Sequence, residues 1–134
     1  MKAILDTGVW VALIDKSESR HDICVEWFKD YHGRLFSSEA VLTEVLYLLD
    51  FSVKAQSAAI DFVAKSVVQI IPSSVESIIR CGELMQKYSD LPMDYADATL
   101  VCIGIDLGIT DIVTLDRRDF SVYRIGSRRF NIIP

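Results

Sequence analysis

Short, unbroken apolar runs alternate with segments of helical periodicity, and this alternation constrains the fold of the chain more than any other feature. The runs predict strands at residues 2–5, 34–36, 67–71, 111–115 and 131–133. Between them, apolar spacing and capping residues predict helices at residues 9–14, 19–32, 41–49, 55–65, 74–88 and 94–107. Strands without polar alternation are buried on both faces, so we expect an α/β protein, a three-layer α/β/α sandwich with a short parallel central sheet.

The length of 134 residues predicts one domain spanning residues 1–134. No apolar stretch is long enough to cross a membrane, and the N-terminal MKAILDTG lacks the form of a signal peptide. We therefore expect a cytoplasmic protein. The three cysteines include no C-x-x-C pair, which predicts reduced, buried thiols. The two histidines have no cysteine at ligand spacing, which argues against a zinc site.

Charge is distributed unevenly along the chain. From Asp116 onward there are five arginines and two aspartates, a charge of +3 out of a total of −5, which leaves −8 for the residues before it. An acidic body with an arginine-rich end does not match a protein that coats DNA generally. The basic end is either a phosphate-binding surface or a solvated one, and charge alone does not decide between them.

Acidic residues occur at four places where apolar surroundings make a charge costly. They are Asp6 after the first strand, Glu44 in VLTEVLYLL, Asp94 and Asp97 in MDYADATLV, and Asp116 in IVTLD. The carboxyl ends of parallel strands form one edge of a sheet, where ligands bind in such folds, so Asp6 and Asp116 are expected at that edge. Helix caps or turns explain most of these acids singly, but they do not explain a common edge.

Clustered carboxylates repel one another and need a compensating cation. Oxygen ligands without nearby histidine or cysteine suit Mg²⁺ or Mn²⁺, and such an ion can activate water and stabilise charge on a phosphate. Thr7 and Thr114 flank the acids and are expected to hydrogen-bond the ligands or the water. Asp94 and Asp97 are three residues apart on one helix, so both can face one site. We expect Asp97 to be the ligand or base and Asp94 to cap the helix.

Four segments together resemble the PIN-domain ribonucleases, in particular VapC-type toxins of bacterial and archaeal toxin–antitoxin modules. The segments are ILDTGVWVALID, AVLTEVLYLL, LPMDYADATLVCIGIDLG and IVTLDRRDF, in the order and spacing of that family. The resemblance implies that Asp6, Glu44, Asp97 and Asp116 surround one or two Mg²⁺ or Mn²⁺ ions, with Thr114 as the accompanying hydroxyl. It also implies hydrolysis of RNA by a metal-activated water, a homodimer and a cognate antitoxin.

The sequence departs from the family pattern at two positions. Gly8 stands where Ser or Asn is common, which removes one side-chain hydrogen bond near the metal, and Asp94 is an additional acid. Neither change removes a member of the quartet. We also expect Arg117 and Arg118, just past the acidic edge, to contact RNA phosphates.

Several other functions compete with this interpretation. The triplet Asp6-Thr7-Gly8 also occurs in aspartic proteases, but these require an all-β fold. A phosphoacceptor receiver domain needs paired acids after the first strand and a late lysine, whereas the last lysine here is Lys87. A PIN nuclease of RNA processing, or a module that binds RNA or an antitoxin without turnover, remains an alternative to the toxin.

Overall fold

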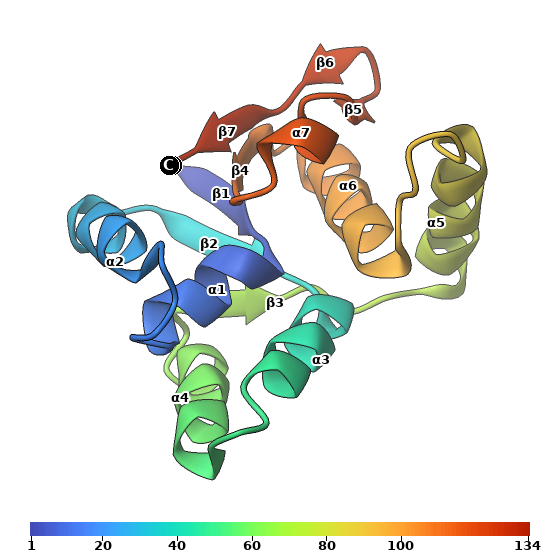
Figure 1. Ribbon diagram of the computed structural model, residues 1–134. Helices are drawn as coiled ribbons and strands as arrows, with labels where there is room; N and C mark the ends of the chain where they lie inside the picture. Colours follow the sequence, from blue (N-terminus) through green and yellow to red (C-terminus); the bar gives the residue numbers. More distant parts are fainter.

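The computed structural model describes residues 1–134 and contains a five-stranded parallel sheet (Figure 1). The strand order is β3-β2-β1-β4-β7, and every neighbouring pair is parallel. The strands are β1 (Lys2–Leu5), β2 (Arg34–Ser37), β3 (Val68–Ile70), β4 (Asp111–Val113) and β7 (Asn131–Ile133). All five predicted strands are present, and the α/β/α fold is confirmed.

Helices cover both faces of this sheet. Those before β3 are α1 (Thr7–Ile14), α2 (His21–Asp30), α3 (Glu39–Leu48) and α4 (Val53–Ala64), and those between β3 and β4 are α5 (Val75–Lys87) and α6 (Tyr95–Leu107). The chain moves outward from β1 to β3 and then crosses back to β4, so right-handed connections place the two groups of helices on opposite faces. Figure 1 shows α5 and α6 packed together, and α3 is the helix of the other group that contacts α6.

Local sequence explains where these helices begin and end. Ser38, Ser52 and Ser74 cap α3, α4 and α5, each accepting a hydrogen bond from a backbone N–H in the first turn. Gly108 ends α6 in the left-handed conformation, with a φ of 66°, which a side chain would strain. The helix boundaries agree with the predicted ones to within about two residues, the usual uncertainty of helix ends.

The hydrophobic core is one cluster of 31 buried residues that joins the sheet to both helical layers. Helices α1 and α6 contribute the most buried positions among the helices, and Trp10 of α1 is completely buried. All three cysteines are free and buried, as predicted. The helix that follows Asp6 and the helix that carries Asp97 are therefore the ones held most firmly by packing.

Residues 114–129 differ most from the predicted structure. Strand β4 ends at Val113 and not at Leu115, and a short helix α7 (Arg117–Phe120) follows. A hairpin of β5 (Arg124–Ile125) and β6 (Arg128–Arg129) then precedes β7. Elements of two to four residues contain too few positions to establish a period, so the pattern did not reveal them.

The observed fold also excludes one of the competing interpretations, the aspartic protease. Helices and a parallel sheet are incompatible with the all-β fold that an aspartic protease needs around Asp6-Thr7-Gly8.

None of the helices combines the length and the apolar character that crossing a membrane requires.

Candidate active site

The site lies where the strand order reverses, between β1 and β4. Both strands are central and parallel, with Leu5 opposite Val113. The chain beyond β1 stays close to β4, because the backbone N–H of Asp6 donates to the carbonyl of Val113 at 3.0 Å. The crevice at such a reversal is the usual ligand site of open α/β sheets. Asp6 and Thr114 therefore meet at this edge, as their positions in the sequence predicted.

Asp6 is held by one hydrogen bond on each carboxylate oxygen. Its Oδ1 accepts from the backbone N–H of Thr7 at 2.8 Å, which caps α1, and its Oδ2 accepts from the Thr114 hydroxyl at 2.7 Å. Burial raises the pKa of Asp6 to about 6, although the two hydrogen bonds act to lower it. The charges of Asp116 and Glu44 contribute to the rise. The capping role and the site role of Asp6 thus coexist.

Glu44 is half-buried in the middle of α3 and is linked to the first helix. The Thr7 hydroxyl donates to its Oε1 at 2.7 Å. A hollow of about 500 Å³ beside it is lined by Thr7, Thr43, Glu44, Tyr47 and Leu48. Thr7 therefore serves both carboxylates, through its backbone N–H to Asp6 and through its side chain to Glu44.

Asp97 lies in the first turn of α6, where Asp94 caps the helix. The backbone N–H of Asp97 donates to Asp94 Oδ1 at 2.8 Å, which agrees with the predicted capping role of Asp94. Burial, together with the nearby charges of Asp94, Asp6 and Asp116, raises the pKa of Asp97 to about 7. The hydroxyl of Tyr123 donates to Asp97 Oδ2 at 3.3 Å.

Asp116 caps α7, three residues beyond the end of β4. Its Oδ1 accepts from the backbone N–H of Asp119 at 3.0 Å, and its own N–H donates to the Thr114 hydroxyl at 2.9 Å. Thr114 thereby connects Asp116 with Asp6. Asp119 therefore lies beside Asp116 at the border of the site, and burial and the charge of Asp116 raise its pKa.

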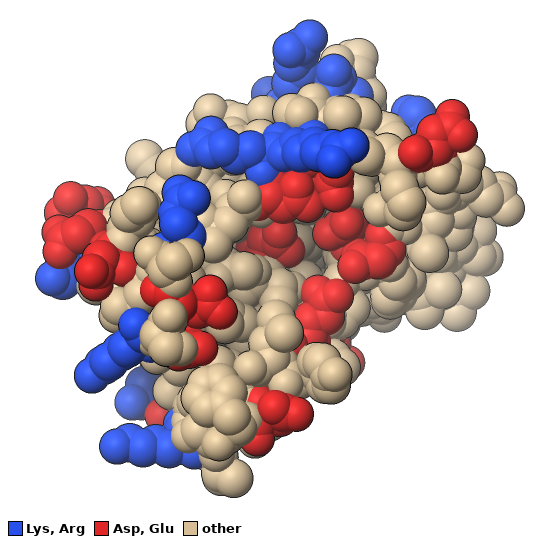
Figure 2. Space-filling model, in the orientation of Figure 1, with Lys and Arg blue, Asp and Glu red and all other residues tan.

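The structure brings together all four predicted acids, Asp6, Glu44, Asp97 and Asp116. Figure 2 shows acidic side chains around a hollow in the middle of one face. The two ion pairs of the molecule, Lys29–Glu26 and Arg80–Asp106, involve none of them. The site therefore concentrates negative charge without a basic partner.

The chemistry of these residues suits a hard divalent cation, although their side chains do not enclose one. The donors are all oxygen atoms, they come from separate elements, and they lack a counter-charge, which are the properties of a Mg²⁺ or Mn²⁺ site. As the side chains stand, no three acidic, histidine or cysteine residues form a group that encloses an ion. Three of the carboxylates instead each accept a hydrogen bond from a different hydroxyl group of the protein.

Gly8 leaves room for a side chain beside the site. A Cβ at this position would lie 3.7 Å from the Leu115 side chain, an ordinary van der Waals distance. Packing therefore does not require glycine at this position. Gly8 lacks the polar side chain of the Ser or Asn that is common here in the family pattern, and the lack of a side chain relieves no clash.

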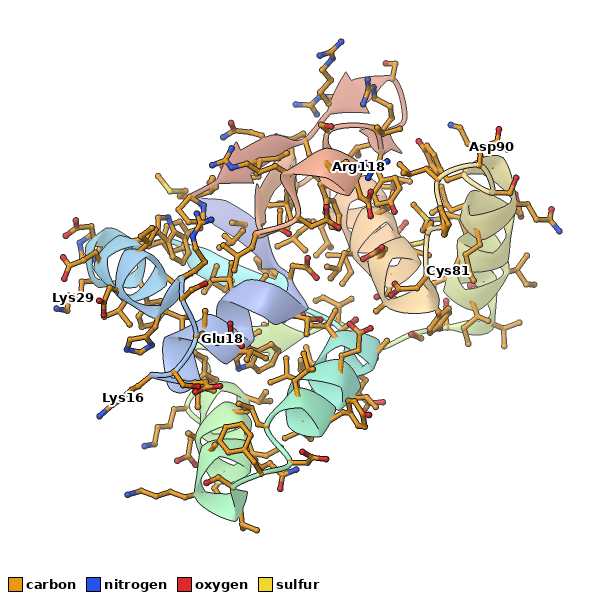
Figure 3. All side chains as sticks on the ribbon, viewed as in Figure 1. Lys16, Glu18, Lys29, Cys81, Asp90 and Arg118 are labelled. Atoms are coloured by element: carbon orange, nitrogen blue, oxygen red, sulfur yellow. The ribbon has the colours of Figure 1, made fainter.

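The basic segment borders the acidic hollow. In Figure 2 a row of basic side chains runs along its upper rim, and Figure 3 places Arg118 on α7. The charge of Arg118 opposes the rise in the pKa of Asp119. The guanidinium of Arg117 donates to the carbonyl of Pro134, so part of its hydrogen-bonding capacity is used within the protein.

The sequence did not identify Asp119 and Tyr123 as site residues. Asp119 had a local signal, since it follows Asp116 by three residues and occupies the N3 position of α7. The sequence signal at Tyr123 was weak. A buried tyrosine generally needs a hydrogen-bond partner for its hydroxyl, but the position of Tyr123 in the sequence does not reveal that the partner is Asp97.

Comparison with known proteins places this geometry in a family. A family model described as PIN domain matches residues 3–125. The chain is 31% identical to Ribonuclease VapC26 of Mycobacterium tuberculosis (strain ATCC 25618 / H37Rv), over 98% of this chain and 99% of that protein.

Two solved structures share the fold. One is VapC20 of Mycobacterium tuberculosis, a sarcin-ricin loop cleaving toxin, with a TM-score of 0.80 and 21% identity over 87% of this chain and 91% of that chain. The other is VapBC2 of Rickettsia felis bound to a promoter DNA fragment, with a TM-score of 0.69 and 20% identity over 100% of both chains. The chain therefore belongs to the PIN-domain family, among its VapC-type members.

Proposed function

We propose that this protein is a Mg²⁺- or Mn²⁺-dependent endoribonuclease and the toxin of a toxin–antitoxin pair. The observation that carries the proposal is the gathering of four half-buried carboxylates, from separate elements, at the carboxyl edge of the sheet without a basic partner. Similarity to Ribonuclease VapC26 supports RNA as the substrate. An RNA-processing nuclease, or a binding module without turnover, is the alternative.

In this proposal Asp6, Glu44, Asp97 and Asp116 hold the cation, which when bound stabilises phosphate charge and lowers the pKa of water. Thr7 and Thr114 orient Glu44 and Asp6 through hydroxyl hydrogen bonds of 2.7 Å each. Asp94 fixes the start of α6 and thereby the backbone position of Asp97. These residues define the hydrolytic centre, and the basic rim binds the RNA backbone beside it.

We expect the purified protein to cleave a fluorophore-labelled RNA when Mn²⁺ or Mg²⁺ is added and to lose this activity in excess EDTA. Asp6→Asn and Asp97→Asn each remove one negative oxygen ligand, so each should lower cleavage by at least about a hundredfold. Asp22→Asn on the surface of α2 is the control for the loss of one charge and should cleave like the wild type. Equal cleavage by all four proteins would contradict the proposed centre.

Arg117 and Arg118 are expected to bind RNA phosphates, with Arg118 contributing more because Arg117 also contacts Pro134. In the inactive Asp97→Asn background, replacing both arginines with alanine should weaken RNA binding. The slope of log K against log salt should become about 1 to 2 units less steep, as measured by fluorescence anisotropy.

A matched control removes the same charge elsewhere. Lys16 and Lys29 lie at the left of the molecule in Figure 3, away from Arg118. Their double alanine variant should keep the wild-type salt slope. If both double variants gave the same slope, the arginines would have no specific role in binding RNA.

The raised pKa values of Asp6 and Asp97 predict an unusual pH dependence of stability without metal. Each of these carboxyl groups binds its proton more tightly in the folded protein than in the unfolded chain. The stability that this preference adds is therefore fully present below the ordinary pKa of 3.8, and it is lost as pH rises through about 6 for Asp6 and about 7 for Asp97. In EDTA, Asp6→Asn should therefore gain stability over the wild type as pH rises from 4 to 7, by on the order of 1 kcal/mol. Urea unfolding at each pH measures this difference, and a constant difference would contradict it.

An exposed apolar surface beside Glu44 supports a protein partner. Tyr47, Phe51 and Val53, around the turn between α3 and α4, are 72%, 64% and 77% exposed. Exposed apolar groups of this size that lie together are typical of interaction sites. We propose that the cognate antitoxin covers this surface, close enough to the acids to block access to them.

The proposed cognate antitoxin should inhibit the RNA cleavage of this protein. Phe51→Ser with Val53→Ser should weaken that inhibition at least about tenfold, because the apolar area that the partner buries is lost. Leu107→Ser, at the far end of α6 from Asp97, controls for the loss of an exposed apolar side chain. Unchanged inhibition of the double variant would place the partner on another surface.

Three further features remain proposals. We propose that residues 1–134 act as one domain, that the protein functions in the cytoplasm, where its RNA substrate is present, and that it forms a homodimer. Exposed apolar side chains of α5, among them Ile78 and Ile79, offer a surface for self-association.

A further inference from the structure

The hydroxyl of Tyr123 reaches the site from inside the protein. Tyr123 is completely buried, and the only hydrogen bond of its hydroxyl goes to Asp97 Oδ2, at 3.3 Å. Most buried tyrosines bond to backbone or water, whereas this one is committed to a carboxylate of the proposed metal centre. The contact joins the segment after α7 to the first turn of α6.

The ring of Tyr123 has no freedom to move away from this position. It packs edge-to-face against Tyr88, with ring centroids 5.1 Å apart, and against Phe120, at 5.2 Å. Phe120 in turn packs edge-to-face against Phe130 at 5.6 Å. Two aromatic rings therefore pack directly against the phenol, a third supports Phe120 from behind, and the hydroxyl of Tyr123 points at Asp97.

The turn that carries Tyr123 is also fixed through its backbone. The Arg124 guanidinium donates to the carbonyls of Ser121, Val122 and Tyr123 at 2.8, 2.7 and 3.1 Å. The backbone N–H of Arg124 donates to the Tyr88 hydroxyl at 3.0 Å. A donor held in this way orients its acceptor, because the acceptor is the more mobile partner.

Asp97 needs such a partner more than the other acids of the site do. The charges of Asp94, Asp6 and Asp116 all disfavour its ionised form. Repulsion from these groups would turn its side chain outward, toward water. A hydroxyl on the inner wall of the hollow opposes that rotation and keeps the carboxylate facing the other ligands.

A shared pattern supports this role. Thr114 donates to Asp6 and Thr7 donates to Glu44, each from a buried hydroxyl at 2.7 Å. Tyr123 completes the pattern for Asp97, so three of the four acids each have one dedicated hydroxyl donor.

We propose that Tyr123 is a positioning residue that holds the Asp97 carboxylate in the orientation needed to bind the divalent cation. The proposal rests on the proposed function, because it assigns Tyr123 to the same metal centre. Tyr123 does not itself contact the cation or the RNA, and it acts only through Asp97.

The test is Tyr123→Phe, which keeps the buried ring and removes only the hydroxyl. Titration with Mn²⁺, followed by the electron paramagnetic resonance of the free ion, should show about tenfold weaker binding. The kcat for labelled RNA at limiting Mn²⁺ should fall and recover when Mn²⁺ is raised, while KM stays unchanged. Thermal unfolding should remain close to that of the wild type.

Tyr31→Phe is the matched control, since it also removes a phenol hydroxyl, one that donates to the carbonyl of Arg34 at the start of β2, at the end of the sheet away from the acids. It should bind Mn²⁺ like the wild type. In an Asp97→Asn background, Tyr123→Phe should have no additional effect on Mn²⁺ binding, because the acceptor that it orients has already changed.

The outcomes separate this inference from the proposed function. A wild-type protein that neither binds Mn²⁺ nor cleaves RNA overturns the proposed function and the inference with it. A wild type that does both, beside a Tyr123→Phe variant with equal Mn²⁺ affinity, overturns the inference alone. The inference also fails if Tyr123→Phe weakens Mn²⁺ binding equally with and without Asp97.

Discussion

Repulsion among carboxylates that share one hollow is the constraint on which the rest of this structure depends. Like charges at close range raise one another's pKa, and the side chains separate unless the surrounding protein holds them. Here the holding groups are a parallel pair of central strands, three helix starts and three hydroxyl donors. Burial and mutual repulsion raise the pKa of Asp6 to about 6 and that of Asp97 to about 7, which indicates a site that favours a cation.

Helix capping and site formation use the same residues. Asp6 caps α1, Asp94 caps α6 and Asp116 caps α7, so three helices begin at the acidic hollow. The amino end of a helix stabilises negative charge, which partly offsets the cost of burying these acids. The capping roles that the sequence offered for Asp6 and Asp94 are therefore present in the structure, and they are compatible with the metal-binding role that we propose for the acids of the hollow.

The sequence predicted the sheet, the long helices and the edge at which the acids gather. Those features depend on local patterns: apolar runs for the strands, capping serines for the helices, and acids that follow strands. Tyr123 and the hairpin after α7 could not be predicted in this way. The contact between Tyr123 and Asp97 joins residues 26 positions apart and depends on how three aromatic rings pack, which no local period encodes.

The adjacency of β1 and β4 has a consequence for how the protein is made. The hydrogen bond between Thr114 and Asp6 joins residues 108 positions apart, and Asp116 follows Thr114 by two. During synthesis the ribosome must release most of the chain before these groups can meet. Contacts of such large sequence separation form late in folding. A nascent chain thus carries its first carboxylate long before it has an assembled site.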